Sequence, residues 1–273
     1  MPYLSAAGYG TRLPPMKTSF RFILLLALWL PSPASAGGGL AVEQGRFRVT
    51  LNDRILSQAE LTGMTFALGE KRDHQLATIE SVEDDPSAAG GLLTLYHITL
   101  RAGEGALPSE LCAPDARGRR LGLPLTGRDG SFRFVCTSGA AGKCVLLGYR
   151  PWDDRPGLPM RDLHQACVHM IRADYGGDDR PATRDGTQID VFDRFGIQTA
   201  ADLPSMSFEA AWGPAGALCV AHPRRPEIIT LAGVGERHPG LLGALGPEVC
   251  NLDTLRGNGS AILFNRSRQT PDP

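Results

Sequence analysis

The segment Met160-Arg-Asp-Leu-His-Gln-Ala-Cys-Val-His-Met-Ile-Arg-Ala-Asp-Tyr175 has the residue spacing of an amphipathic α-helix. Its apolar positions recur three or four residues apart, which places them on one face. Cys167 belongs to that face and is therefore predicted to point into the core. Gly176 and Gly177 follow, and glycine readily adopts the left-handed conformation in which many helices end. We predict one principal helix over residues 160–175.

The rest of the chain predicts β-strands. Its 273 residues include 33 glycines and 21 prolines, which break a chain into short segments and favour strands and turns. Strand-like segments occur at 46–51, 61–68, 76–82, 92–100, 131–136, 143–149, 187–193, 208–212 and 217–221. The predicted fold class is α+β and β-rich, with short strands and hairpins, one principal helix and stabilising disulfides.

Residues 1–36 have the features of a secretory signal peptide. Lys17 and Arg21 precede the apolar run Phe22–Leu30, and the small residues Ala34-Ser35-Ala36 follow. A positive region, a short apolar region and an A-x-A motif are the three parts of a cleavable signal. A membrane anchor is the alternative, but this run is too short for a spanning helix, which needs about 20 apolar residues.

Cleavage of this signal predicts a mature protein that begins near Gly37 and is secreted or periplasmic. The usual length of a signal indicates Met16 as the true start. The mature chain is predicted to consist of an N-terminal segment (37–59), one continuous domain (60–255, strand-rich over 60–150 and helix plus strands over 151–255) and a C-terminal tail (256–273). The tail is expected to fray from Arg266 onward.

The charge balance bears on partners. The chain has 28 basic and 29 acidic side chains, and three of the basic ones lie in the signal peptide. The mature part is therefore slightly acidic, and its basic residues form no stripe that would attract a phosphate backbone. We expect no nucleic-acid partner and, after cleavage, no membrane contact. The partner is unknown, and an exported protein is expected to meet one in the cell envelope or outside the cell.

Six cysteines occur in the mature chain: Cys112, Cys136, Cys144, Cys167, Cys219 and Cys250. An even number in an exported protein predicts disulfides, although sequence alone does not choose the pairing. We favour Cys136–Cys144, because these two residues lie on neighbouring predicted strands joined by a turn of small residues. A zinc site is the alternative, but Cys219-x-x-His222 is only half of one. We expect no metal and no cofactor.

The segment His164–Asp193 is the richest in chemically active side chains, and its candidate catalytic residues are His164, Asp174 and Asp190. A thiol enzyme would use Cys167 as nucleophile and a histidine as base. The inward direction predicted for Cys167 suits a buried disulfide better than an exposed thiolate. Asp174 is instead expected to accept backbone N–H groups or to pair with Arg172.

Gly148-Tyr-Arg-Pro-Trp152 offers a second candidate site. Exposed Tyr149 and Trp152 rings would form a ligand platform, whereas buried rings would close the edge of a core. No complete catalytic or metal-binding set is present in the sequence. The leading hypothesis is therefore a non-catalytic binding or structural module, and the alternative is an exported hydrolase-type enzyme with its site around His164–Asp190.

Several short motifs, in this order, resemble the ADYC-domain family of exported bacterial proteins: Leu111-Cys112, Phe132-x-Phe-x-Cys136, Gly142-Lys-Cys-Val145, Gly148-Tyr-Arg-Pro-Trp152, His164-Gln-Ala-Cys167, Arg172-Ala-Asp-Tyr175, Gly186-Thr-Gln-Ile-Asp190, Phe208-Glu-Ala-Ala-Trp212 and Gly216-Ala-Leu-Cys219. The resemblance extends from about Leu61 to Cys250. It implies export but no particular activity, substrate or cofactor.

The chain departs from the family at the signature itself. Ala173, Asp174 and Tyr175 match it, but Gly176 stands where the family has cysteine. If that cysteine pairs within the domain, the resemblance implies that its partner here is unpaired or has re-paired.

Overall fold

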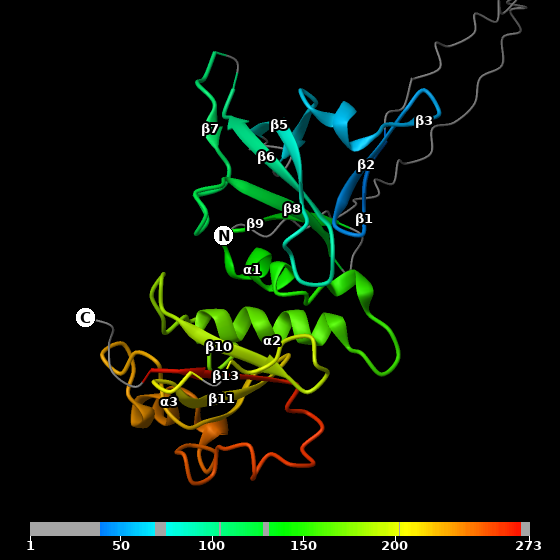
Figure 1. Cartoon of the computed structure of the whole chain (residues 1–273). Helices are drawn as coiled ribbons and strands as arrows, with labels where there is room; N and C mark the ends of the chain where they lie inside the picture. Colours follow the sequence, from blue (N-terminus) through cyan, green and yellow to red (C-terminus); the bar gives the residue numbers. More distant parts are fainter. Residues whose placement is uncertain (1–38, 69–74, 104, 128–130, 202, 269–273) are drawn as a thin grey trace, which may run out of the picture.

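The computed structural model describes residues 39–68, 75–103, 105–127, 131–201 and 203–268. The predicted signal peptide, with Met16 and the cleavage motif, lies outside these residues. Figure 1 shows strands β1 to β9 in the upper part, helix α2 across the middle, and a separate lower sheet with α3 below the helix. The structure confirms the predicted β-rich α+β class.

Two antiparallel sheets form the upper part. The first contains, in spatial order, β1 (Gly39–Glu43), β2 (Arg46–Leu51) and β3 (Arg54–Ile55). A 3-10 turn, η1 (Gln58–Leu61), leads to the second, which contains in spatial order β4 (Thr65–Leu68), β5 (Gln75–Asp85), β6 (Leu93–Arg101), β8 (Leu121–Thr126) and β9 (Phe132–Cys136), with β7 (Ser109–Glu110) paired to β6. Most of the predicted strands therefore form, with shifted ends.

Phe47 joins these two sheets. Its ring is fully buried, and its centroid lies 4.9 Å from that of Tyr96 and 6.2 Å from that of Phe134. The Tyr96 hydroxyl accepts a hydrogen bond from the Phe47 backbone N–H at 3.0 Å and donates one to Gln58. Burial of the aromatic rings supplies the apolar stabilisation, and the hydroxyl is satisfied inside the core.

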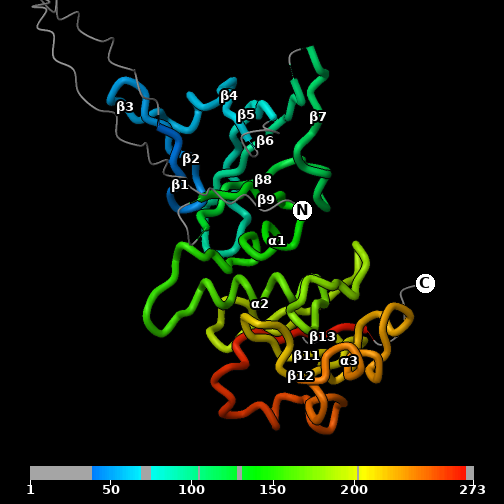
Figure 2. Tube along the Cα trace, turned by 180° about the vertical axis from the view of Figure 1, so that it is seen from behind, coloured from blue at the N-terminus to red at the C-terminus, as the bar shows by residue number. Residues whose placement is uncertain are grey.

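Helix α2 (Met160–Arg172) lies between the upper part and the lower sheet (Figures 1 and 2). Leu163, Cys167 and Met170 are fully buried on it, as the periodicity predicted. The helix ends three residues earlier than expected, because Ala173 takes the left-handed conformation (φ 48°) that we assigned to the glycines. The Ala173 and Asp174 N–H groups close the last turn on the carbonyls of Met170 and His169.

The predicted strand 143–149 is wrong: α1 (Ala140–Leu146) occupies most of it, and η2 (Pro151–Asp153) follows. The Gly139 N–H bonds the Cys136 carbonyl at 2.9 Å, which turns the chain directly after β9. Ala, Lys and Leu then favour a helix. Gly142 allows α1 to lie against β9, because a Cβ there would contact the Cys136 carbonyl oxygen.

The lower sheet has the spatial order β10 (Ile189–Asp193), β13 (Leu263–Ser267), β11 (Ser207–Gly213) and β12 (Gly216–Val220), and the segment between β12 and β13 holds α3 (Leu231–Arg237) and η3 (Pro239–Leu241). The prediction that the chain frays from Arg266 is therefore wrong. Strand β13 is internal to the sheet, and its Asn265 is fully buried and hydrogen-bonded. No helix in the described part of the chain is both long and apolar enough to cross a membrane.

Candidate functional site

Three disulfides join the six cysteines: Cys112–Cys136, Cys144–Cys167 and Cys219–Cys250. The favoured pair Cys136–Cys144 is wrong, because Cys144 lies on a helix and faces α2 rather than a hairpin partner. The pairing also overturns the thiol hypothesis, since Cys167 is a disulfide sulfur. Cys219 is likewise paired, so Cys219-x-x-His222 offers no thiolate ligand, and no cluster of metal-binding side chains occurs in the described ranges.

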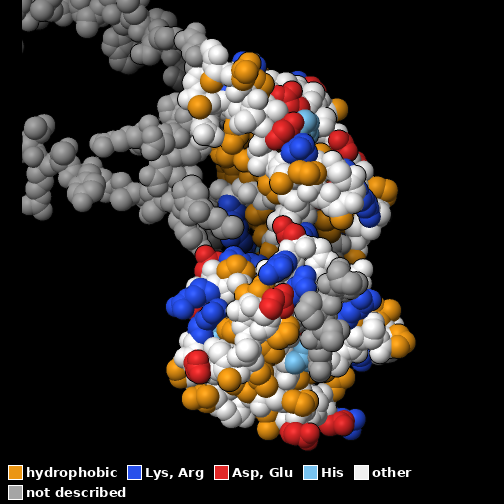
Figure 3. Space-filling view, turned by 90° about the vertical axis from the view of Figure 1, so that its left-hand side faces the viewer, with side chains coloured by type: hydrophobic (Ala, Val, Ile, Leu, Met, Phe, Trp, Pro, Cys, Tyr) orange, Lys and Arg blue, Asp and Glu red, His pale blue; other side chains and the backbone are white. Residues whose placement is uncertain are grey.

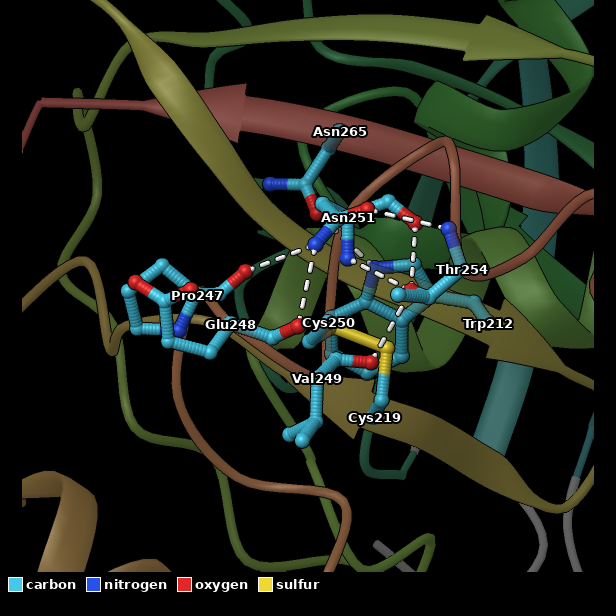
Figure 4. The surroundings of a disulfide bond; sticks show 9 residues. All are labelled: Trp212, Cys219, Pro247, Glu248, Val249, Cys250, Asn251, Thr254 and Asn265. Carbon is cyan, nitrogen blue, oxygen red and sulfur yellow. Dashed lines mark hydrogen bonds between the residues drawn. A yellow bond between two sulfur atoms is a disulfide. The ribbon is translucent and has the colours of Figure 1, made fainter.

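The Cys219–Cys250 disulfide anchors a loop beneath the lower sheet (Figure 4). Asn251 organises that loop by donating from its side-chain amide to the Pro247 carbonyl at 2.9 Å and accepting from the Thr254 N–H at 3.0 Å. The polar side chains of this loop, Asn251 and Thr254, are therefore used in holding the loop together.

His164 is buried against α1. It is 3% exposed, and its Nε2 lies 3.1 Å from the Ala141 carbonyl oxygen. Burial lowers the pKa of His164 to about 4, and this effect outweighs the hydrogen bond to Ala141, which acts in the opposite direction. The imidazole is therefore neutral near pH 7 and lies in contact with protein atoms rather than with a substrate space.

His164 is expected to make the fold sensitive to mild acid. The unfolded chain binds a proton on this residue near pH 6.5, whereas the folded protein binds it only near pH 4. Between these values the unfolded state holds more protons, so stability falls as the pH is lowered, by on the order of 2 kcal/mol. Urea unfolding at pH 7 and pH 4.5 should show a smaller loss for His164→Gln than for the wild type. An equal loss in both proteins would contradict this assignment.

His169 and Asp174 form a buried pair at the end of α2. His169 Nδ1 lies 3.0 Å from Asp174 Oδ2, and His169 Nε2 lies 2.9 Å from the Gln165 amide nitrogen. Asp174 also accepts the backbone N–H groups of Asp178 and Asp179, each at 3.1 Å. Asp174 thus holds the loop after α2, as expected from its backbone contacts, but its side-chain partner is His169, and Arg172 pairs with Asp179 instead.

Asp190 lies on β10 and has separate partners. Its Oδ1 accepts the Ala201 N–H at 2.9 Å, and its Oδ2 lies 3.6 Å from an Arg266 guanidinium nitrogen. Across the described residues, no hydrogen bond or ion pair links His164, Asp174 and Asp190 to one another. Each of the three is held by a different element.

A buried polar network centred on Glu209 (β11) was not among the predicted sites. This residue is fully buried, and its carboxylate accepts from the Arg224 guanidinium at 2.9 Å, the Tyr175 hydroxyl at 3.0 Å and the Asn265 amide at 2.7 Å. Asn265 in turn accepts from the Trp212 indole N–H at 2.8 Å. All the members of the network therefore have hydrogen-bond partners.

Arg224 connects this network to α2. It donates to the Met170 carbonyl at 2.7 Å, one of the carbonyls at the end of the helix, where a cation is favourable. Burial alone lowers the pKa of Arg224, but the nearby Glu209 carboxylate outweighs it and raises the pKa overall. The sequence does contain a sign of this network, because a single carboxylate lies within the apolar strand Phe208-Glu-Ala-Ala-Trp212. A charged residue in such a strand indicates that it has a partner of opposite charge in the core.

Residues 58–226, more than half of the sequence, match the family model of the ADYC domain. The chain belongs to the ADYC domain family. Neither a curated protein nor a solved structure matches it. In this ADYC domain the signature residues have structural contacts: Ala173 ends α2, Asp174 holds the following loop, and Tyr175 stacks on Trp212 with ring centroids 5.5 Å apart.

Gly176 completes this turn in the ADYC domain. The described cysteines are all paired, so none has been left over by the absence of a cysteine at position 176. The space beside Gly176 is occupied by His238, because a Cβ there would contact the His238 ring. Gly177 is more restricted, since it has φ +66° and a Cβ there would contact the backbone of Ala215.

Gly176→Ala is expected to destabilise the protein by about 1–3 kcal/mol through overpacking against His238. The backbone at Gly176 does not require glycine, so the cost comes from this contact. His238→Ala should therefore recover much of the loss when it is combined with Gly176→Ala. Thermal unfolding of both single variants and the double variant measures the coupling, and strictly additive effects would contradict the proposed contact.

The segment Gly148–Trp152 closes the core edge in this structure. Tyr149 is fully buried and its hydroxyl donates to Asp193 at 3.0 Å. Arg150 is 7% exposed and donates to the carbonyls of Ala89 and Gly91. Trp152 packs against a cluster of buried residues in the upper part. Of the two alternatives for these rings, the structure therefore favours the core edge over the ligand platform.

Proposed function

We propose that this ADYC domain is an exported, disulfide-stabilised module that acts by binding a partner in the cell envelope or outside the cell, without catalysis. One observation carries the non-catalytic part. The candidate catalytic residues His164, Asp174 and Asp190 are bound to internal partners, and the one cysteine of the segment His164–Asp193 is in a disulfide.

Export is supported by two independent features. The signal-like sequence of residues 1–36 precedes the described chain, and three disulfides are typical of proteins that fold in an oxidising compartment. On the face drawn in Figure 3, basic and acidic side chains are interspersed rather than gathered into one basic stripe. That distribution supports a partner other than nucleic acid.

Export is tested by expressing the chain with and without residues 1–36 in a bacterial host. The full chain should be recovered outside the cytoplasm, cleaved near Gly37, with all six cysteines protected from alkylation under denaturing, non-reducing conditions. The chain without the leader should carry free thiols in the cytosol. An intact precursor in the cytosol with six free thiols would contradict the proposal.

The absence of catalysis is tested on the purified oxidised protein with a panel of ester, peptide and glycoside substrates. We expect no turnover above that of a heat-denatured sample. Turnover that disappears in His169→Gln or Asp190→Asn, with the circular dichroism spectrum unchanged, would overturn the non-catalytic part and favour the hydrolase alternative.

A further inference from the structure

A small cavity opens where the strand-rich upper part meets α1. Its volume is about 180 Å³, and it is lined by Ser87, Ala88, Asp115, Ala116, Arg117, Arg119, Thr137, Lys143 and Leu146. The lining comes from the turn between β5 and β6, the loop before β8, the end of β9 and α1. A larger hollow of about 440 Å³ beside α3 lacks such a gathering of cations, since its charged lining is Glu236 and Arg237.

The two carboxylates at this cavity are already satisfied. Asp85, behind the lining, accepts from the Ser87 N–H at 2.9 Å and from Arg119 at 2.7 Å. Asp115 accepts the backbone N–H groups of Arg117 and Arg119 at 2.9 and 3.0 Å, and the Thr137 hydroxyl at 3.1 Å. The hydrogen bond from the Ser87 hydroxyl is the largest effect on Asp85, and together with the contact with Arg119 it lowers the pKa of Asp85 to about 2 against the opposing effect of burial.

Two cations at the rim keep free donors. Within the described part of the chain, the Lys143 ammonium has no hydrogen-bond or ion-pair partner, although the residue is half-buried. Arg117 uses one terminal nitrogen, Nη1, to donate to the Ser87 hydroxyl at 2.8 Å and to Asp85 Oδ2 at 3.4 Å, and its side chain is 59% exposed. Arg119 is held more closely, because it pairs with Asp85 at 2.7 Å and with Asp115 at 3.1 Å.

The charge balance defines the ligand. Three cations stand against two ionised carboxylates, which leaves an excess of one positive charge at the cavity. Ala88, Ala116 and Leu146 provide an apolar wall next to it. A cation with free N–H groups forms charge-assisted hydrogen bonds to an anion, and one negative charge balances the excess here.

We propose that this cavity binds a small monocarboxylate, with the carboxylate on Lys143 and Arg117 and a short apolar stem against Ala88, Ala116 and Leu146. This ligand class, a small monocarboxylate, rests on the proposed binding function. The same carboxylate chemistry is offered by a free short-chain acid and by the C-terminus of a peptide.

The test is NMR titration of the full mature protein with four probes: isobutyrate, N-acetyl-Ala-Ala, the amide of N-acetyl-Ala-Ala, and inorganic phosphate. We expect the first or second probe to shift the signals of Lys143, Ala116 and Leu146 saturably, and the uncharged amide to leave them unchanged. Isobutyrate alone would identify a free acid, and the peptide alone a C-terminal carboxylate. Tighter binding of inorganic phosphate than of either carboxylate would overturn the assignment.

Variants separate specific binding from general charge effects. Lys143→Gln and Arg117→Gln should each weaken binding on the order of tenfold, because each removes a charge-assisted hydrogen bond. Arg256→Gln, a highly exposed control in the C-terminal loop, should leave binding unchanged. If no probe shifts the cavity signals, this inference fails while the binding-module proposal stands; turnover of a substrate would instead overturn that proposal.

Discussion

Arg224→Met is expected to lower the free energy of unfolding by about 3–5 kcal/mol, because it leaves the Glu209 carboxylate buried without its cation. The side chains of this pair are 1% and 0% exposed, and their nitrogen and oxygen lie 2.9 Å apart. The substitution also removes the donor to the Met170 carbonyl at the end of α2. Urea unfolding followed by circular dichroism gives the change.

Arg256→Met is the matched control for this result. Arg256 and Asp253 form an ion pair at the same separation, 2.9 Å, but their side chains are 82% and 81% exposed. Such exposed pairs contribute at most about 1 kcal/mol. Similar losses for the two variants would show that burial does not govern the Arg224 pair. In Arg224→Met/Glu209→Leu both charges are absent, so part of the stability should return.

Replacing both Cys144 and Cys167 by alanine is expected to cost about 2–5 kcal/mol, as for other native disulfides. This disulfide is fully buried and links α1 to α2, which lie between the strand-rich upper part and the lower sheet. Its loss should therefore also weaken the coupling between the two parts. Hydrogen exchange should then report different opening free energies for β8–β9 and β11–β13.

The Cys112–Cys136 disulfide provides the control. Its cysteines are 24 residues apart in sequence, against 23 for Cys144–Cys167, so the constraint on the unfolded chain is nearly the same. Cys112→Ala/Cys136→Ala should cost a similar amount, yet its effect on exchange should stay within the upper part. Uniform exchange changes in both double variants would contradict the role assigned to Cys144–Cys167.

The buried Glu209–Arg224 pair also explains how the family signature contributes to this fold. The Tyr175 hydroxyl donates a hydrogen bond to Glu209. The same hydroxyl oxygen accepts the Arg224 backbone N–H at 3.2 Å. Burial, together with the Glu209 charge, holds the pKa of Tyr175 well above its ordinary value. The tyrosine therefore acts as a neutral donor that fixes the end of α2 to the lower sheet.

Local patterns predicted the elements with the strongest periodicity. Helix α2 was recognisable because its apolar residues recur at helical spacing, and β6 because its residues form a long apolar run between turns. Segment 143–149 was wrongly predicted as a strand, because seven mostly apolar residues fit either a strand or a helix. The turn at Gly139 and the close packing of Gly142 against β9 favour the helix.

The sequence by itself determined the fold class, the position of α2, the expectation of disulfides and membership in the ADYC family, because each depends on patterns within short stretches. Only the tertiary structure decided which cysteines pair, that Glu209 and Arg224 are buried together, and that Lys143 and Arg117 line one cavity. Those features join residues far apart in the chain. Their contacts depend on how whole strands and helices pack, which no local periodicity specifies.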